Sequence, residues 1–183
     1  MTFLKDTNSG NLLKEIRANS PLIWNISNFV SMDIAANMLL SIGASPAMAH
    51  AIEEAESFAN LSKAINGALT INIGTFDKHW QKCAVKVANE AKLHDIPWVL
   101  DPVGAGASEF RSNNAKELLF LKPTVLRGNG SEIISISGIS NSGKGVDSTS
   151  SSNEALDAAV KISNDNDIIA VSYTHLRAHE TSA

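Results

Sequence analysis

The 183-residue sequence has a single cysteine, Cys83, so it can form neither an internal disulfide nor a cysteine-rich zinc site. It has little excess charge, because 15 basic and 19 acidic side chains give a net charge of −4. That balance argues against a general nucleic-acid or membrane binder. The sequence also lacks a signal-peptide pattern and any apolar run of the roughly 18 residues that a membrane span requires. These absences and the length predict one globular domain in the cytoplasm.

The remaining sequence alternates between apolar strand-like runs and amphipathic helical segments. Apolar periodicity and Gly or Pro boundaries predict helices over 11–18, 31–43, 53–65, 76–95, 113–122, 130–137 and 152–163. Near-continuous apolar runs predict strands over 22–24, 68–75, 96–102, 123–129 and 167–172. Strands that alternate with helices in this way indicate an α/β fold, in which helices cover both faces of a mostly parallel sheet.

Two segments allow more specific predictions. The helix over 76–95 carries Trp80, Ala84, Val87 and Ala91 on one stripe, which we expect to face the core, and Cys83 is expected to pack there as a small apolar residue. Residues 135–153 are rich in Ser, Gly and Asn and predict a loop. That loop is equally compatible with a surface linker and with a lid over a ligand.

Polar and glycine residues follow four of the predicted strands, at 27–28, 72–75, 101–106 and 127–132. Ligands of parallel sheets collect beyond the carboxyl ends of strands, so these segments are the candidate site. The glycines of DPVGAGAS also fit a plain turn, and the spacing is not that of a Walker A loop. The run RGNGSE places Arg127, two glycines and Glu132 at one strand end, although an acidic residue in a first helical turn is also ordinarily stabilising.

Five segments together resemble the hydroxyethylthiazole kinases of thiamine biosynthesis, a family within the ribokinase-like superfamily. They are SNFVSMDIAANMLLSIGASPAMAHAIEE, LTINIGT, HDIPWVLDPVGAGASEFR, VLRGNGSEI and KGVD, and the resemblance runs from about Leu12 to Ala170. It implies a ribokinase-like fold and transfer of the ATP γ-phosphate to 4-methyl-5-(2-hydroxyethyl)thiazole. It also implies Mg²⁺ and a homotrimer with sites between subunits.

Two other functions remain open at this point. The chain could be a non-catalytic fragment that binds thiazole or self-associates, or a related ribokinase-group vitamin kinase. The ASPAMAH segment favours a thiazole kinase over the vitamin kinase.

The resemblance assigns ligand contacts to five residues. Met48, Asn28 and Val30 match the family's substrate-side positions, and a soft thioether such as that of Met48 suits a flat sulfur heterocycle, although core packing is the alternative role. Arg127 matches the family's arginine that contacts the nucleotide phosphates. A guanidinium suits this role because it can donate two parallel hydrogen bonds to phosphate oxygens. Ser172 falls on the family's nucleotide-contacting threonine.

Three further residues match positions that organise Mg²⁺ in the superfamily. Asn129 and Glu132 fit its Asn-x-x-Glu pattern, and Asp101 is a second acidic candidate, with a helix or turn cap as its alternative role. Oxygen ligands that act partly through water are those that Mg²⁺ prefers.

The last residues of the sequence depart from the family pattern. The family places a catalytic cysteine or aspartate in a Gly-rich turn beyond the strand that ends at Ala170, and no residue here matches it. We therefore expect residues 1–170 to be a partial kinase domain, incomplete at its C-terminus and inactive as given. Residues 171–181 read VSYTHLRAHET, which resembles the translation of a transposase sequencing adapter. We expect 171–183 to be a non-native tail.

Overall fold

The computed structural model describes residues 8–139 and 148–173, with no side chains described for 148–151. In chain order its elements are α1 Ser9–Asn19, β1 Leu22–Ile26, α2 Met32–Ile42, β2 Ser45–Ala47, the 3₁₀ helix η1 Ile52–Glu54, α3 Ala55–Ala64, β3 Ala68–Asn72, α4 Lys78–Leu93, β4 Trp98–Asp101, α5 Glu109–Phe120, β5 Val125–Asn129, α6 Gly130–Ile136, α7 Ser148–Asn166 and β6 Ile169–Tyr173. Within these residues, none of the helices is both long and apolar enough to cross a membrane.

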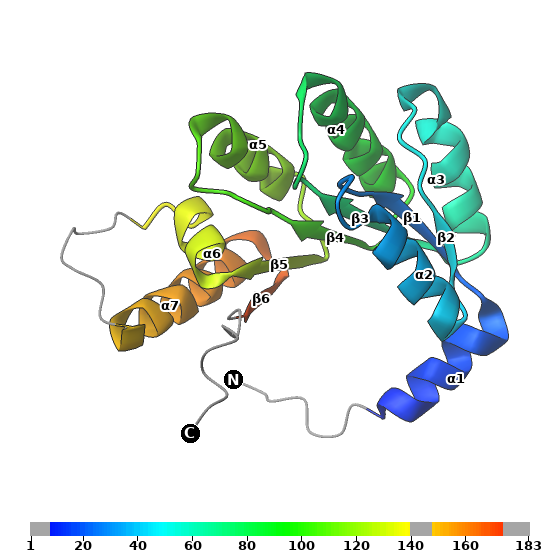
Figure 1. The fold of residues 1–183 in the computed structure, drawn as a ribbon, viewed down its shortest axis with the longest axis horizontal. Helices are drawn as coiled ribbons and strands as arrows, with labels where there is room; N and C mark the ends of the chain where they lie inside the picture. Colours follow the sequence, from blue (N-terminus) through cyan, green and yellow to red (C-terminus); the bar gives the residue numbers. More distant parts are fainter. Residues whose placement is uncertain (1–7, 140–147, 174–183) are drawn as a thin grey trace.

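The six strands form one sheet in the order β2-β1-β3-β4-β5-β6, and every neighbouring pair is parallel. Helices α3, α4 and α5 lie along one side of the sheet, whereas α1 and α2 lie beside β1 and β2 on the other side (Figure 1). The predicted α/β class is confirmed. The chain leaves β1 toward β2 and then returns past β1 to β3, so the strand order reverses between β1 and β3. Ligands of such sheets bind at this reversal.

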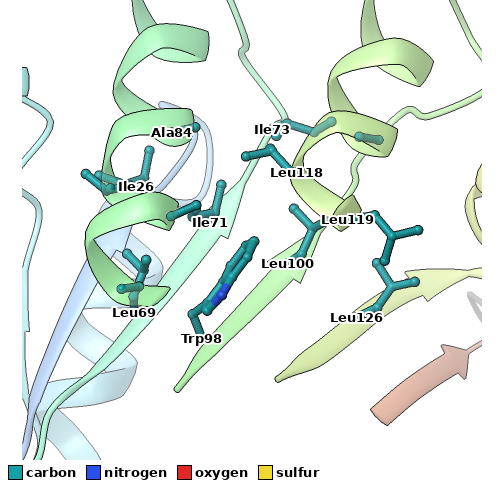
Figure 2. Close-up of a cluster of buried hydrophobic side chains, with 14 of the residues drawn as sticks. Ile26, Leu69, Ile71, Ile73, Ala84, Trp98, Leu100, Leu118, Leu119 and Leu126 are labelled. Atoms are coloured by element: carbon teal, nitrogen blue, oxygen red, sulfur yellow. The ribbon is translucent and has the colours of Figure 1, made fainter. Parts of the chain in front are cut away.

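The core lies between the sheet and helices α4 and α5. Ile71, Leu100 and Leu126 come from three neighbouring strands and are fully buried, and Figure 2 shows them grouped with side chains of these helices. The predicted stripe on α4 is confirmed, because Trp80, Ala84, Val87 and Ala91 are all buried, as is Cys83. Since side chains alternate along a strand, the residues between the buried ones point to the opposite face of the sheet.

Several predicted boundaries differ from the structure. β1 continues to Ile26, two residues beyond the prediction, and the short strand β2 was not predicted. Three residues give little periodicity to detect, and Ser45 and Pro46 are untypical of strands. Helix α7 begins at Ser148, inside the segment predicted as a loop, since a serine run carries little helical pattern. The rest of that loop, with the KGVD motif at 144–147, lies outside the described residues.

Helix α2, Met32–Ile42, begins and ends where the sequence predicts, and differs only in how its start is capped. Ser31 precedes the helix as predicted, but its side chain makes no capping hydrogen bond, and Gly43 ends the helix in the left-handed conformation as expected. At the other end of the chain, β6 crosses the expected boundary at Ala170 and pairs with β5 as far as Tyr173. The remainder of the expected tail, 174–183, lies outside the described residues.

Candidate active site at the carboxyl ends of the strands

Four polar side chains form a hydrogen-bonded line across the carboxyl ends of β1, β3, β4 and β5. Asn28 Nδ2 donates to Asn72 Oδ1 at 2.7 Å, and Asn72 Nδ2 donates to Asp101 Oδ2 at 2.9 Å. Arg127 Nη1 lies 3.4 Å from the same Asp101 oxygen. We call these residues the strand-end line. It starts at the reversal of strand order between β1 and β3, so three predicted site residues, Asn28, Asp101 and Arg127, are brought together where ligands are expected.

Asn28 supplies the cap that Ser31 does not. Its Oδ1 accepts hydrogen bonds from the backbone N–H groups of Val30 and Ser31, each at 3.0 Å, at the start of α2. Gly74 allows this packing, because a Cβ at that position would lie 2.8 to 2.9 Å from atoms of the Asn28 side chain. Asn28 is therefore buried and held on both sides, and only glycine fits beside it.

Met48 directly follows β2, and the residues after it are bound to β1. Trp24 Nε1 donates to the Ala49 carbonyl at 3.0 Å, and the Ser27 N–H donates to His50 Nε2 at 3.1 Å. Because Nε2 accepts, the His50 proton is on Nδ1, which faces the Met48 carbonyl at 3.2 Å. Burial lowers the pKa of His50 below its usual value, against the opposing effect of the backbone hydrogen bonds. The half-buried Met48 is thus held next to the end of β1.

Val30 lies in the turn before α2, next to an exposed apolar stripe of that helix. Val30, Ile34 and Met38 are spaced four residues apart and are 81%, 71% and 63% exposed. Ile34 and Met38, four residues apart within α2, lie on one face of that helix. Val30 therefore borders Asn28 and faces outward rather than into the core of the chain.

Arg127 presents its guanidinium at the opposite end of the strand-end line. Its side chain is half exposed and stacks on the Tyr173 ring, with 4.3 Å between the guanidinium carbon and the ring centroid. Ser172 does not join it. Ser172 pairs with Gly128, one position out of phase with Arg127, so its side chain is on the other face of the sheet.

Glu132 connects two strand-end segments. Its Oε1 accepts the Gly104 N–H and its Oε2 accepts the Asn129 N–H, both at 2.9 Å, while Asn129 Oδ1 accepts the Glu132 N–H at 3.0 Å. The last two bonds form a capping box at the start of α6. The stabilising role considered for Glu132 is therefore present, and the carboxylate is buried among backbone donors.

The donor set suits a cation held partly through water. Within residues 8–139 and 148–173, no three His, Cys, Asp or Glu side chains are close enough to ligate one ion. Asn129 Oδ1 also accepts from the Ser131 hydroxyl at 2.7 Å, so it is engaged in the cap. The other hard oxygen donors at adjacent strand ends are the carboxylates of Asp101 and Glu132, although each Glu132 oxygen already accepts one backbone N–H. Mg²⁺ is commonly bound by one or two carboxylates with several waters.

Two residues of this site were not identified from the sequence. Asn72 lies in a predicted strand-end segment, but only the strand register shows that it is opposite Asp101. Arg111 lies in the first turn of α5 and donates to three backbone carbonyls, those of Ile73 at 2.6 Å, Gly74 at 2.7 Å and Val103 at 3.0 Å. No sequence pattern indicates that an arginine will donate hydrogen bonds to backbone carbonyls, so this role of Arg111 could not be predicted.

A parallel sheet with polar side chains at its strand-order reversal, an accessible arginine and two carboxylates places the chain among the α/β proteins whose ligands bind at the carboxyl ends of the strands. The comparisons narrow this class. The family model described as the hydroxyethylthiazole kinase family matches residues 13–175. The chain belongs to the hydroxyethylthiazole kinase family.

Individual relatives agree with that family. The chain is 50% identical over 156 residues to a hydroxyethylthiazole kinase from Rhizobium rhizogenes, covering 85% of this chain and 57% of the relative. It is 51% identical over 150 residues to one from Leptospira interrogans, covering 80% and 54%. The solved structure of a hydroxyethylthiazole kinase protein from Pyrococcus horikoshii OT3 matches with a TM-score of 0.77 and 37% identity, covering 90% of this chain and 59% of that one. The chain thus spans somewhat more than half the length of these relatives.

Proposed function

We propose that the protein is a phosphotransferase of thiamine biosynthesis or salvage that uses ATP and Mg²⁺ to phosphorylate 4-methyl-5-(2-hydroxyethyl)thiazole. The observation that carries the proposal is the strand-end line, which joins Asn28 to Arg127 in a chain of this family. In the reaction the alcohol oxygen bonds to the γ-phosphorus, the bond from that phosphorus to the bridging oxygen of ADP breaks, and the hydroxyl proton is released. ATP use implies action in the cytoplasm.

The residues divide into two groups at the two ends of the line. Asn28, Val30 and Met48 surround the end of β1 and provide the polar and apolar contacts for the thiazole alcohol. Arg127 in β5 supplies the positive charge for the phosphates. Its guanidinium is half exposed, so N–H groups of this side chain can donate to phosphate oxygens. We therefore propose Arg127, rather than Ser172, as the residue that contacts ATP.

Asp101 and Glu132 are the residues that would hold Mg²⁺, through waters as well as directly. When bound, the ion supplies positive charge that neutralises phosphate oxygens. Glu132 also fixes the Gly104 and Asn129 backbone groups, so it orders the β4–α5 turn and the start of α6 whether or not a cation is present.

We also propose that the exposed α2 stripe binds a second copy of the chain, in a homotrimer whose sites lie between subunits. The support is that Val30, Ile34 and Met38 leave an apolar face exposed beside Asn28. Replacing Ile34 and Met38 by lysine should give a monomer by light scattering. An unchanged oligomer in that variant would contradict the proposed interface.

We retain the proposal that residues from about Val171 are not native. The support is the match of VSYTHLRAHET to an adapter translation. Resequencing the locus from independently prepared DNA should replace these residues, and recovery of THLRAHETSA would contradict the proposal.

The activity is tested with protein expressed from the resequenced gene. We expect ADP formation that depends on the thiazole alcohol, with a phosphorylated thiazole identified by mass spectrometry. A hydroxymethylpyrimidine, offered as the competing alcohol, should give background turnover. Preferential phosphorylation of the pyrimidine would favour the related vitamin kinase, and absence of turnover with retained thiazole binding would favour a non-catalytic binding protein.

A further inference from the structure

Asn72 is at the centre of the strand-end line, between Asn28 and Asp101. It is the last residue of β3 and pairs with Asp101, the last residue of β4. Its Oδ1 accepts hydrogen bonds from Asn28 Nδ2 at 2.7 Å and from the Gly74 N–H at 2.9 Å. Its Nδ2 donates to Asp101 Oδ2 at 2.9 Å. One amide therefore joins the substrate side to the phosphate side.

The orientation of this amide is determined by the backbone. A backbone N–H can only donate, so the Gly74 N–H must face the Asn72 oxygen, and the Asn72 nitrogen must then face Asp101. The same reasoning fixes Asn28, because its oxygen accepts two N–H groups of the α2 start and its nitrogen is left to donate to Asn72. The line consequently runs in one direction and ends on the Asp101 carboxylate.

Asn72 and Arg127 donate to the same oxygen of Asp101. The Asn72 bond is 2.9 Å long, within the normal range, whereas the Arg127 contact is 3.4 Å and weak. An arginine and a carboxylate frequently form a pair with two hydrogen bonds, which is the stronger arrangement. The carboxylate is thus held by the Asn72 amide, while the Arg127 guanidinium is stacked on the Tyr173 ring at 4.3 Å, and the contact between the carboxylate and the guanidinium is weak.

We propose that Asn72 is a positioning residue that holds Asp101 away from full pairing with Arg127 and so leaves the guanidinium free to bind a phosphate. The inference rests on the proposed function, because it takes Arg127 as the phosphate-binding cation. Without the Asn72 amide, Asp101 turns toward Arg127 and competes with the phosphate. Asn72 acts through Arg127 and touches no phosphate itself.

The experiment measures ATP binding to the 183-residue chain by calorimetry in excess EDTA, so that only protein groups hold the phosphates. Asn72→Ala should weaken ATP binding roughly tenfold, the size expected when one charge-assisted pair is diverted. Thr70→Val is the matched control. Thr70 lies on the same face of β3 and its hydroxyl donates to Asn25 Oδ1 at 2.8 Å, so this variant also removes a cross-strand hydrogen bond, and it should bind ATP within about twofold of wild type.

A double variant distinguishes positioning from a structural role. Adding Asp101→Asn to Asn72→Ala removes the competing carboxylate and should restore ATP affinity to near the wild-type value. Provided that wild type binds ATP through Arg127, either of two results would overturn the inference. These are an unchanged ATP affinity in Asn72→Ala and no recovery of ATP affinity in the double variant. If wild type and Arg127→Ala bind ATP equally, the proposed nucleotide site itself is wrong and the inference falls with it.

Folding of the variants is verified by circular dichroism. Should Asn72→Ala not fold, Asn72→Ser takes its place, since it also removes the Nδ2 donor. A crystal structure of the variant gives a second readout without ligand: two hydrogen bonds between Arg127 and Asp101 are expected, and an Asp101 carboxylate in its original position would overturn the inference.

Discussion

Replacing Arg111 by alanine should destabilise the chain because this side chain connects the turns after β3 and β4. Its guanidinium donates to the carbonyls of Ile73, Gly74 and Val103 at 2.6 to 3.0 Å. Hydrogen bonds to charged groups contribute about 1.5 to 3 kcal/mol each, and water can reach part of this half-buried site. We therefore expect Arg111→Ala to lower the free energy of unfolding by about 2 to 4 kcal/mol in total.

The assay is urea unfolding followed by tryptophan fluorescence. Arg111→Lys keeps the charge but not the forked geometry, so it should recover only part of the lost stability. Lys116→Ala, an exposed change in the same helix, serves as the control and should shift the free energy of unfolding by less than about 0.5 kcal/mol. Equal stabilities of Arg111→Ala and Lys116→Ala would refute the argument that the three carbonyl contacts hold the two turns.

Three other predictions concern Glu132, Gly74 and Cys83. Glu132→Gln places an amide N–H₂ against a backbone N–H, so it should lower the free energy of unfolding by about 1 to 3 kcal/mol in urea denaturation. Gly74→Ala should lower the melting temperature, because its Cβ would clash with Asn28. Burial raises the pKa of the Cys83 thiol from 9.0 to about 11. The unfolded chain therefore loses this proton first, so stability should fall as pH rises from 9 to 11, and less steeply in Cys83→Ala.

The fold was largely predictable because its signals are local. Near-continuous apolar strands such as ALTIN and WVLD, and the α4 stripe around Val87, carry the parallel α/β pattern in a few residues each. β2 was missed because three residues contain no measurable period. Helix α7 begins earlier than the sequence predicts, because serine is a weak helix former and packing on α6 and β6 supports that helix.

The site was predictable in its location but not in its connections. The position of Asn28, Asp101 and Arg127 at strand ends is enough to predict them as site residues from the sequence. The partners of these residues depend on which strands are neighbours. Asn72 reaches Asp101 because β3 pairs with β4 in register, and Arg111 reaches its carbonyls across two turns. Such contacts are set by tertiary structure, which a single sequence does not display.

The most direct test of the central claim, that the strand-end line is the ligand site, is NMR chemical-shift mapping on the isotopically labelled chain. The thiazole alcohol should shift the amide signals of residues 27–30 and 72–75, and ATP should shift those of 101–106 and 127–132. The account is contradicted if both ligands instead shift signals elsewhere, for example around the cavity of about 480 Å³ between α1 and the end of α3, lined by Glu15, Ile16 and Ile65.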